Sequence, residues 1–304
     1  MGMKASNGNI RMEKAPDGAS LRIGCWQVAG DVSGTVILLH GRTEFLEKYS
    51  EVVSELNGRG FDVWSMDWRG QGLSDRMLEH LQKGHIDRFE TYIGDLVWFV
   101  DEIVHTRRGP VILLAHSMGG HVGIRAVLET RIKPDGLVTT APMIALPMGR
   151  LATMGSRIIS NLAAGVGLGK RYGPGMSDHD PARVKFDNNP LTDDRERFNR
   201  FYELLARNPG LALGGVTWGW LSAAFDSMAE LQRLARDPAE VCPVLICTAV
   251  ADRVLSIGAQ SALSDAVENW TQIRLDGARH EPMMETDAIR ARFWAAFDDF
   301  VRTV

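Results

Sequence analysis

A serine at a predicted turn between a strand and a helix is the residue that most directly suggests chemistry. Ser117 lies in the segment AHSMGG, after a strand-like run at residues 110–116 and before a helical pattern at residues 118–130. In this context the pattern small–x–Ser–x–Gly predicts a nucleophile elbow, although Ala115 stands where the stricter pattern has glycine. The backbone N–H of Met118, at the start of the helix, is a candidate oxyanion donor.

A serine nucleophile needs a general base, and the base needs a carboxylate that orients it. His280 follows a predicted strand at residues 271–277, and Asp252 ends a predicted strand at residues 241–252. The order serine, acid, histidine is typical of hydrolases built on α/β sheets. We therefore expect Ser117, Asp252 and His280 to form a catalytic triad. The alternatives for the acid and the base are Asp226, Asp276, His80, His85, His105, His116, His121 and His179.

The segment HGRTEF at residues 40–45 follows another strand and is the expected source of a second oxyanion donor. Gly41 allows the backbone to turn close to the reacting centre, which would direct the N–H of Arg42 at the developing charge. Glu44 has two roles that remain equally open. It could order this loop by accepting backbone hydrogen bonds, or it could be a favourable carboxylate at a helix N-terminus.

Strand and helix patterns alternate through two parts of the chain. Buried-strand patterns occupy residues 21–29, 35–40, 61–68, 110–116, 136–142, 241–252 and 271–277. Amphipathic helical patterns occupy residues 44–60, 89–106, 118–130, 256–267 and 285–304. This alternation predicts an α/β fold with a mostly parallel central sheet flanked by helices. All three predicted catalytic side chains would then project from strand ends at one edge of the sheet.

Residues 143–238 interrupt the alternation with helical patches of little β character. We therefore expect a helical cap at 143–238, inserted into a core formed by residues 21–142 and 239–304. Residues 1–20 are predicted to be a polar N-terminal segment. The cap offers apolar side chains to an acyl chain, and the candidates for substrate contact are Phe201, Trp218 and Trp220.

The composition is that of an ordinary globular protein and excludes several function classes. Of 304 residues 45% are hydrophobic and 24% are charged, and 34 Lys and Arg against 38 Asp and Glu leave a net charge of −4. This balance gives no reason to expect nucleic-acid binding. No apolar run approaches the ~20 residues of a membrane span, and the polar N-terminus lacks the apolar region of a secretory signal. We therefore expect a cytoplasmic protein, and its 3 Cys imply no disulfide framework.

Several segments together resemble a known family. HGRTEFLEKY, DWRGQGLSDR, AHSMGGH, ADRV and GARHE are similar to segments of α/β-hydrolase lysophospholipases of the monoacylglycerol-lipase-like group, the bacterial L2 type above all. The resemblance extends from about residue 20 to the end of the chain. It implies Ser117 as nucleophile, His280 as base and Asp252 as acid, with the backbone N–H groups of Arg42 and Met118 as oxyanion donors.

The sequence thus predicts a serine carboxylic-ester hydrolase that acts on lysophospholipid or monoacylglycerol through an acyl-enzyme. A short-chain carboxylesterase, an acyltransferase and a non-catalytic binding protein on the same fold are the alternatives. The chemistry requires no cofactor and no metal, and no obligate protein partner is implied. The segment RLATMGSRIISNLAAGVGLGKR is mildly apolar with basic ends. It is read either as an ordinary cap helix or as a transient, peripheral contact with the inner membrane face.

Overall fold

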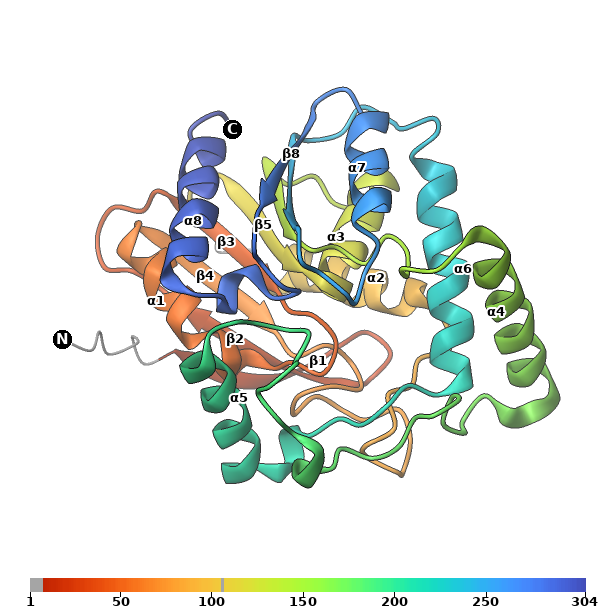
Figure 1. The fold of residues 1–304 in the computed structure, drawn as a ribbon. Coiled ribbons are helices and arrows are strands. Elements are labelled where there is room, and N and C mark those ends of the chain that lie inside the picture. The colour runs from red at the N-terminus through yellow and green to blue at the C-terminus, as the bar shows by residue number, and fades with distance from the viewer. Residues whose placement is uncertain (1–7, 105–106) are drawn as a thin grey trace.

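A single eight-stranded sheet organises the molecule in the computed structural model, which describes residues 8–104 and 107–304 (Figure 1). The spatial order of the strands is β1-β2-β4-β3-β5-β6-β7-β8. The strands are β1 (Asn9–Lys14), β2 (Ser20–Trp26), β3 (Gly34–Leu39), β4 (Phe61–Met66), β5 (Val111–His116), β6 (Gly136–Thr140), β7 (Val244–Ala249) and β8 (Trp270–Leu275). Strands that precede and strands that follow the long helical insertion in the sequence pair within this one sheet. The two parts of the chain therefore form a single α/β unit.

Among the described strands the sheet is parallel from β4 to β8, whereas β1 pairs antiparallel with β2 and β2 pairs antiparallel with β4. The prediction of a mostly parallel α/β sheet is therefore confirmed. The parallel strands share one carboxyl edge, and the loops that leave this edge after β3, β5, β7 and β8 carry the predicted site residues. Ligands bind at this edge in open α/β folds.

Helices cover both faces of the sheet and form two separate hydrophobic cores. The main helices are α1 (Ser50–Gly58), α2 (Phe89–Trp98), α3 (Ser117–Leu128), α4 (Arg150–Ala163), α5 (Arg195–Arg207), α6 (Trp218–Leu234), α7 (Ile257–Ala266) and α8 (Asp287–Val301). Alternate residues of the fully buried β3 face opposite sides, so Ile37 and Leu39 pack with α2 and α3 while Val36 and Leu38 pack with α1 and α8. Such continuous apolar runs are typical of parallel strands buried on both faces.

The structure differs from the sequence prediction at three elements. β1 forms within the segment expected to be merely polar, and it pairs with β2 through its backbone while its side chains stay largely exposed. The helix predicted at 44–60 begins with a 3₁₀ turn at Leu46–Tyr49 before α1. The helix predicted at 89–106 is α-helical to Trp98 and continues as a π-helical turn at Phe99–Ile103. Residues 105 and 106 lie outside the described residues.

The insertion between β6 and β7 contains α4, α5 and α6. α6 anchors it, because Phe225 and Leu231 are buried in the core and the Trp220 ring meets Phe89 of α2 at 5.6 Å between centroids. α4 packs on the outer side of α6, as Figure 1 shows at the right of the view. Within the described residues no helix combines the length and apolar character needed to cross a membrane.

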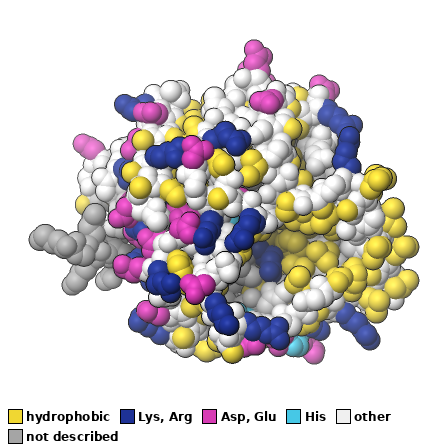
Figure 2. All heavy atoms as spheres, in the orientation of Figure 1, with side chains coloured by type: hydrophobic (Ala, Val, Ile, Leu, Met, Phe, Trp, Pro, Cys, Tyr) yellow, Lys and Arg dark blue, Asp and Glu magenta, His cyan; other side chains and the backbone are white. Residues whose placement is uncertain are grey.

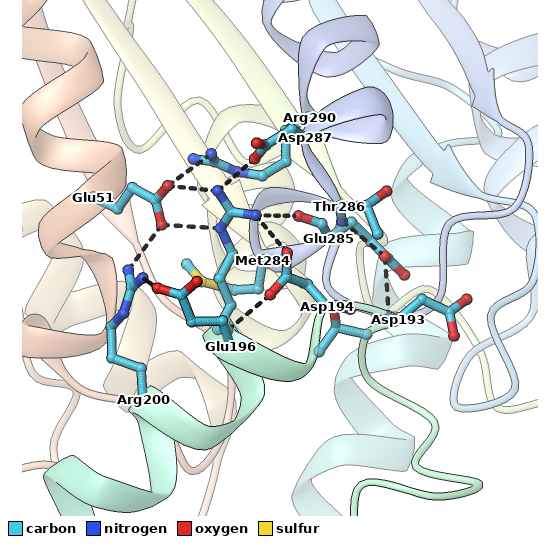
Figure 3. Close-up of polar contacts among 12 residues, drawn as sticks. Glu51, Asp193, Asp194, Glu196, Arg200, Met284, Glu285, Thr286, Asp287 and Arg290 are labelled. Carbon is cyan, nitrogen blue, oxygen red and sulfur yellow. Dashed lines mark hydrogen bonds and ion pairs between the residues drawn. The ribbon is translucent and has the colours of Figure 1, made fainter. Parts of the chain in front are cut away.

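A charged network attaches α5 to the core on the opposite side (Figure 3). Glu51 of α1 accepts hydrogen bonds from Arg197 and Arg200 of α5 and from Arg290 of α8, at 2.6–3.0 Å. Arg197 also donates to the backbone carbonyl of Glu285 at 3.0 Å. Three elements far apart in the chain therefore meet at one carboxylate.

Candidate active site

Ser117 occupies a strained turn between β5 and α3. Its φ of 50° lies in the left-handed region, which a residue with a side chain adopts at a cost. Gly119 makes the turn possible, because a Cβ there would lie 2.5 Å from the carbonyl oxygen of Leu39. Ala115, which stands where the stricter pattern has glycine, is fully buried, and a Cβ on Gly123 would lie 3.8 Å from its Cβ, an ordinary van der Waals distance. The local structure is therefore the elbow that the sequence predicts.

The loops after β7 and β8 bring an acid and a base to this serine. Nε2 of His280 lies 3.0 Å from Oγ of Ser117, although 163 residues separate them in the chain. Nδ1 of the same imidazole lies 2.9 Å from Oδ2 of Asp252. The structure therefore brings together all three residues that the sequence places in a triad, with both ring nitrogens engaged.

Asp252 is held in its ionised form. Burial alone would raise the pKa of this carboxyl, but the hydrogen bond and charge of His280 outweigh burial and lower it. Its Oδ1 also accepts the backbone N–H groups of Val254 at 2.7 Å and Leu255 at 3.2 Å. Charged hydrogen bonds of this kind fix both the orientation and the ionisation of the carboxylate. Asp252 is thus suited to orient an imidazole and to stabilise its charged form.

The other candidates for base and acid have different partners. Nδ1 of His116 lies 3.0 Å from the last carbonyl oxygen of β6, and Nε2 of His121 lies 2.6 Å from Oγ of Ser227. Asp226 forms an ion pair with Arg157 at the surface. The remaining alternatives, none of which has a hydrogen bond or ion pair to the triad within the described residues, are His80, His85, His179 and Asp276. His105 lies outside the described residues.

The loop after β3 lies against the elbow. A Cβ on Gly41 would be 3.2 Å from Cβ of Ser117, so the loop backbone passes close to the serine. Glu44 orders this loop, because its Oε2 accepts the N–H of Gly41 at 2.5 Å and the hydroxyl of Tyr49 at 2.8 Å. Of the two roles left open for Glu44, the structure supports loop ordering.

Two candidate donors of an oxyanion hole belong to residues that lie beside Ser117. The N–H of Arg42 donates to no other residue in the described part of the chain. Met118 is the second residue of α3, and first-turn N–H groups have no partner within their helix. Both N–H groups are thus available to a ligand at Ser117.

A buried charge cluster beneath the site is a feature that sequence reasoning missed. Nζ of Lys48 lies 2.5 Å from a carboxylate oxygen of Glu44 and 2.7 Å from one of Glu281. Burial would lower the pKa of Lys48, but the two carboxylates outweigh burial and raise it. The Glu44–Lys48 spacing of four residues is a recognisable signal, whereas only the fold brings Glu281 to the same ammonium.

The same cluster has the donor set of a metal site, since oxygens of Glu44 and Glu281 and a ring nitrogen of His116 lie within 4.8 Å of one another. The ammonium of Lys48 lies between the two carboxylates and already occupies the position that a cation would take. Burial lowers the pKa of His116 to about 3, so this ring stays neutral, and its centroid lies 5.0 Å from that of His280. The arrangement is that of a structural ion pair supporting the triad histidine.

A cavity of about 430 Å³ opens above Ser117 and His280. Its walls combine the charged floor with apolar side chains from the core loops and the cap, which are Met118, Met143, Leu146, Met176, Leu191, Val216, Val254 and Leu255. Of the three predicted cap contacts Phe201 and Trp220 line the cavity, while Trp218 is not among its lining residues in the described chain. Figure 2 shows a hollow walled by hydrophobic side chains, with Lys and Arg side chains at its rim.

Comparison with known proteins assigns the family. A profile of the family described as serine aminopeptidase, S33, matches residues 30–287. The chain belongs to this family. It is 30% identical over 275 residues to lysophospholipase L2 of Escherichia coli (strain K12), covering 87% of this chain and 79% of that protein. It is also 26% identical over 267 residues to a probable lysophospholipase L2 of Haemophilus influenzae, covering 88% of this chain and 83% of that one.

Solved structures agree on the fold of this family member. A crystal structure of a soluble variant of monoglyceride lipase from Saccharomyces cerevisiae matches with a TM-score of 0.77 at 19% identity, covering 98% of this chain and 97% of that one. A monoacylglycerol lipase from Paleococcus ferrophilus matches with a TM-score of 0.70 at 22% identity, covering 93% and 99%. The predictions of an α/β-hydrolase fold and of a lysophospholipase and monoacylglycerol-lipase-like protein are confirmed.

Proposed function

We propose that this chain is a carboxylic-ester hydrolase that cleaves lysophospholipids or monoacylglycerols through an acyl-enzyme on Ser117. The observation that carries the proposal is the continuous hydrogen-bonded series from Ser117 through His280 to Asp252, facing a cavity with apolar walls. Relatives named lysophospholipase L2 and monoglyceride lipase support an ester of one acyl chain as the substrate.

The reaction follows from the positions of these three groups. Oγ of Ser117 attacks the ester carbonyl carbon while its proton passes to Nε2 of His280, and the carbonyl electron pair moves onto oxygen. Collapse of this intermediate breaks the ester C–O bond, and His280 returns the proton to the departing glycerol oxygen. Water then attacks the acyl-enzyme with His280 again as base, and Ser117 leaves with the proton as the fatty acid is released. Asp252 stabilises the imidazolium in both steps.

The oxyanion is assigned to the backbone N–H groups of Arg42 and Met118. The N–H groups at the start of α3 and the dipole of that helix favour negative charge at this point. The hydrogen bond from Gly41 to Glu44 holds the other donor loop in place before substrate binds. Preorganised donors of this kind stabilise the transition state without reorganisation.

The helical insertion, taken as residues 143–238, is assigned as a cap over a core of residues 21–142 and 239–304. Phe201 of α5 and Trp220 of α6 contribute to the cavity wall from the cap side. An acyl chain lying between them and the core would bury apolar surface at ~25 cal/mol per Å². We assign substrate contact to Phe201 and Trp220, and Trp218 stays a prediction.

The outer face of the cap supports a contact with an anionic membrane surface. Large apolar side chains of α4 and of the turn after it are exposed on one side, and these are Leu151, Met154, Ile158, Ile159, Leu162 and Val166. Figure 2 shows hydrophobic side chains gathered over α4. Residues 143–177 contain Arg150, Arg157, Lys170 and Arg171 but no Asp or Glu. An amphipathic, purely cationic segment suits peripheral binding to anionic lipid, here at the cytoplasmic face of the inner membrane.

A substrate panel on wild type beside Ser117→Ala and Asp252→Asn tests the catalytic proposal. We expect Ser117→Ala to lose ~10³-fold or more of turnover and Asp252→Asn about 10⁴-fold. Wild type should react with a fluorophosphonate probe, and Ser117→Ala should not. Retention of most ester hydrolysis by a folded Ser117→Ala would refute the nucleophile. A preference for p-nitrophenyl acetate over long-chain esters and lipids would favour a short-chain esterase. Transfer of the acyl group to an added alcohol in preference to water would favour an acyltransferase.

Vesicle sedimentation tests the membrane contact. Wild type should bind phosphatidylglycerol vesicles more tightly than phosphatidylcholine vesicles, and added salt should weaken that binding. The double variant Leu151→Ser, Leu162→Ser should lose binding at least tenfold. The matched control Ile10→Ser, Met12→Ser removes two exposed apolar side chains from β1 instead. Equal binding by the two double variants would rule out the α4 face as the contact.

A further inference from the structure

The side chain of Arg42 makes contacts that are separate from the backbone N–H assigned to the oxyanion. Arg42 lines the cavity above Ser117, and its guanidinium extends toward the cap. Nη1 donates to the carbonyl oxygen of Gly214 in the cap at 3.0 Å, and the guanidinium lies 5.8 Å from the centre of the Trp220 ring. Among the described residues no carboxylate lies within 4.0 Å of this cation, and no second hydrogen bond leaves it. Four of its five N–H donors thus have no hydrogen-bond acceptor among the described residues.

Arg42 is half-buried, and other buried or half-buried arginines of this protein are compensated. Arg22, Arg69, Arg125 and Arg290 each bind two carboxylates. Arg76 lacks a carboxylate but donates to four backbone carbonyls. These pairings follow the general requirement that a buried charge be matched.

Arg42 departs from that pattern at the cavity that holds the triad. Burial lowers the pKa of its guanidinium to about 10, so the group still carries its charge at neutral pH. The other cation of the cavity, Lys48, is neutralised by Glu44 and Glu281. Among the described lining residues, Arg42 is therefore the Lys or Arg side chain that has no carboxylate partner within ion-pair distance.

The guanidinium is held in place rather than free to leave the cavity. A Cβ on Gly84 would lie 3.1 Å from Nη1 of Arg42, so the side chain fills a slot that a larger residue at position 84 would narrow. The bond to Gly214 and the face of Trp220 bound the slot on the cap side. Its planar fork of donors therefore has a defined direction, which is what bidentate recognition of an oxyanion needs.

We infer that the Arg42 guanidinium binds the phosphate of a lysophospholipid and thereby selects phosphate-bearing esters over neutral monoacylglycerols. This inference rests on the proposed function, because it places the ester carbon at Ser117. The ester carbon and the phosphorus of a 1-acyl-glycerophospholipid are separated by six bonds, roughly 7 Å when extended. An arginine stem spans roughly 6 Å from Cα to Cζ, so one residue can hold the oxyanion with its N–H and the phosphate with its side chain.

The cavity continues past Arg42 in the direction of the headgroup. A second space of about 300 Å³ shares Arg42, Thr43, Met176, Phe201 and Tyr202 with the first and is otherwise lined by cap residues, including Asp178 and His179. Arg42 thus lies where the two spaces meet. A phosphate bound there leaves room for the amine of a larger headgroup beyond it, beside the carboxylate of Asp178 and the Tyr202 ring.

Soluble substrates that differ by the phosphate test the inference. We would measure kcat/KM for 1-octanoyl-glycerol, 1-octanoyl-glycerol 3-phosphate and 1-octanoyl-glycerophosphocholine with wild type, Arg42→Gln and Arg42→Lys. Loss of a charged, bidentate contact is expected to lower the ratio of phosphate-bearing to neutral kcat/KM about 10²-fold in Arg42→Gln. The ratio for Arg42→Lys should lie between those of wild type and Arg42→Gln, because an ammonium keeps the charge but cannot make the bidentate contact. The ratio is the readout, since any disturbance of the oxyanion loop acts on all three esters alike.

The control variant is Arg183→Gln, which removes the same charge from an exposed cap arginine and should leave the ratio unchanged. A ratio in Arg42→Gln within threefold of wild type would overturn the inference, as would an equal change in Arg183→Gln. If wild type hydrolysed none of the three, the proposed function would fail instead. Calorimetry of 1-octanoyl-glycerol 3-phosphate binding to Ser117→Ala, with and without Arg42→Gln, would then decide the phosphate site separately. Tenfold or greater weakening supports it, and a smaller change overturns it.

Discussion

Replacing Glu51 by Gln should lower the free energy of unfolding by about 2 kcal/mol at neutral pH. Burial would raise the pKa of Glu51, but Arg197, Arg290 and Arg200 outweigh burial and lower it from 4.5 to about 2. At 1.36 kcal/mol for each tenfold change in proton affinity, this fall corresponds to about 3 kcal/mol. The side chain is 27% exposed, so solvent screening reduces the expected value to about 2 kcal/mol.

The pH dependence of the same variant gives a sharper test. A depressed pKa in the folded state stabilises the protein above the unfolded pKa, and this contribution is lost as the carboxylate is protonated. The difference between wild type and Glu51→Gln should therefore be full above pH 4.5 and should vanish as the pH falls toward 2. Other carboxylates titrate in both proteins and cancel in the difference.

Urea unfolding at a series of pH values would measure this difference, and thermal unfolding should show a shift of about 3 °C at pH 7. Glu203→Gln is the matched control, since Glu203 lies on the exposed side of α5 and meets only Arg207, at 3.6 Å, among the described residues. A stability loss in Glu51→Gln no larger than in Glu203→Gln, or a difference that persists unchanged at pH 2, would refute the reasoning.

Two further changes test the packing and charges around the site. Lys48→Met leaves the buried carboxylates of Glu44 and Glu281 without their cation, so urea unfolding at pH 7 should show a loss of about 3–5 kcal/mol. Protonation of either carboxyl relieves that repulsion, so the loss should shrink toward pH 5, and a loss independent of pH would contradict the prediction. Gly119→Ala places a methyl 2.5 Å from a backbone oxygen and should cost at least 2 kcal/mol and lower kcat, whereas Gly258→Ala, in open space on α7, should be neutral or stabilising by up to ~1 kcal/mol. Equal stability and equal kcat in the two alanine variants would show that the turn at Ser117 accommodates the added methyl group, which would contradict the prediction.

The parts of this structure that sequence could predict are those governed by local periodicity. The apolar runs ending at Leu39 and His116 are fully buried strands, as their composition indicates. Because parallel strands end at one edge, the positions of Ser117, Asp252 and His280 just after strands sufficed to predict that they meet. The contacts among them follow from topology rather than from sequence separation.

The parts that sequence could not predict depend on long-range pairing. β1 (Asn9–Lys14) has the polar, mostly exposed side chains of an edge strand, so periodicity carries little signal for it. Glu281 reaches Lys48, and Arg197 reaches Glu51, only because loops of unrelated segments converge. The sequence pointed to the backbone N–H of Arg42. That no described carboxylate pairs with its side chain can be seen only in the three-dimensional structure.

The left-handed backbone at residue 117 also limits which side chains this turn can carry. A β-branched residue at positive φ brings its second γ substituent close to the main chain, so threonine would strain this turn even though it supplies the same hydroxyl. Thr43 and Thr130 adopt φ of 65° and 53° in this chain, so the strain is a cost and not a prohibition. Cysteine and aspartate have the single, unbranched γ position that the turn tolerates. Among nucleophilic side chains, the geometry of one peptide unit therefore favours an unbranched hydroxyl, thiol or carboxylate over a secondary alcohol.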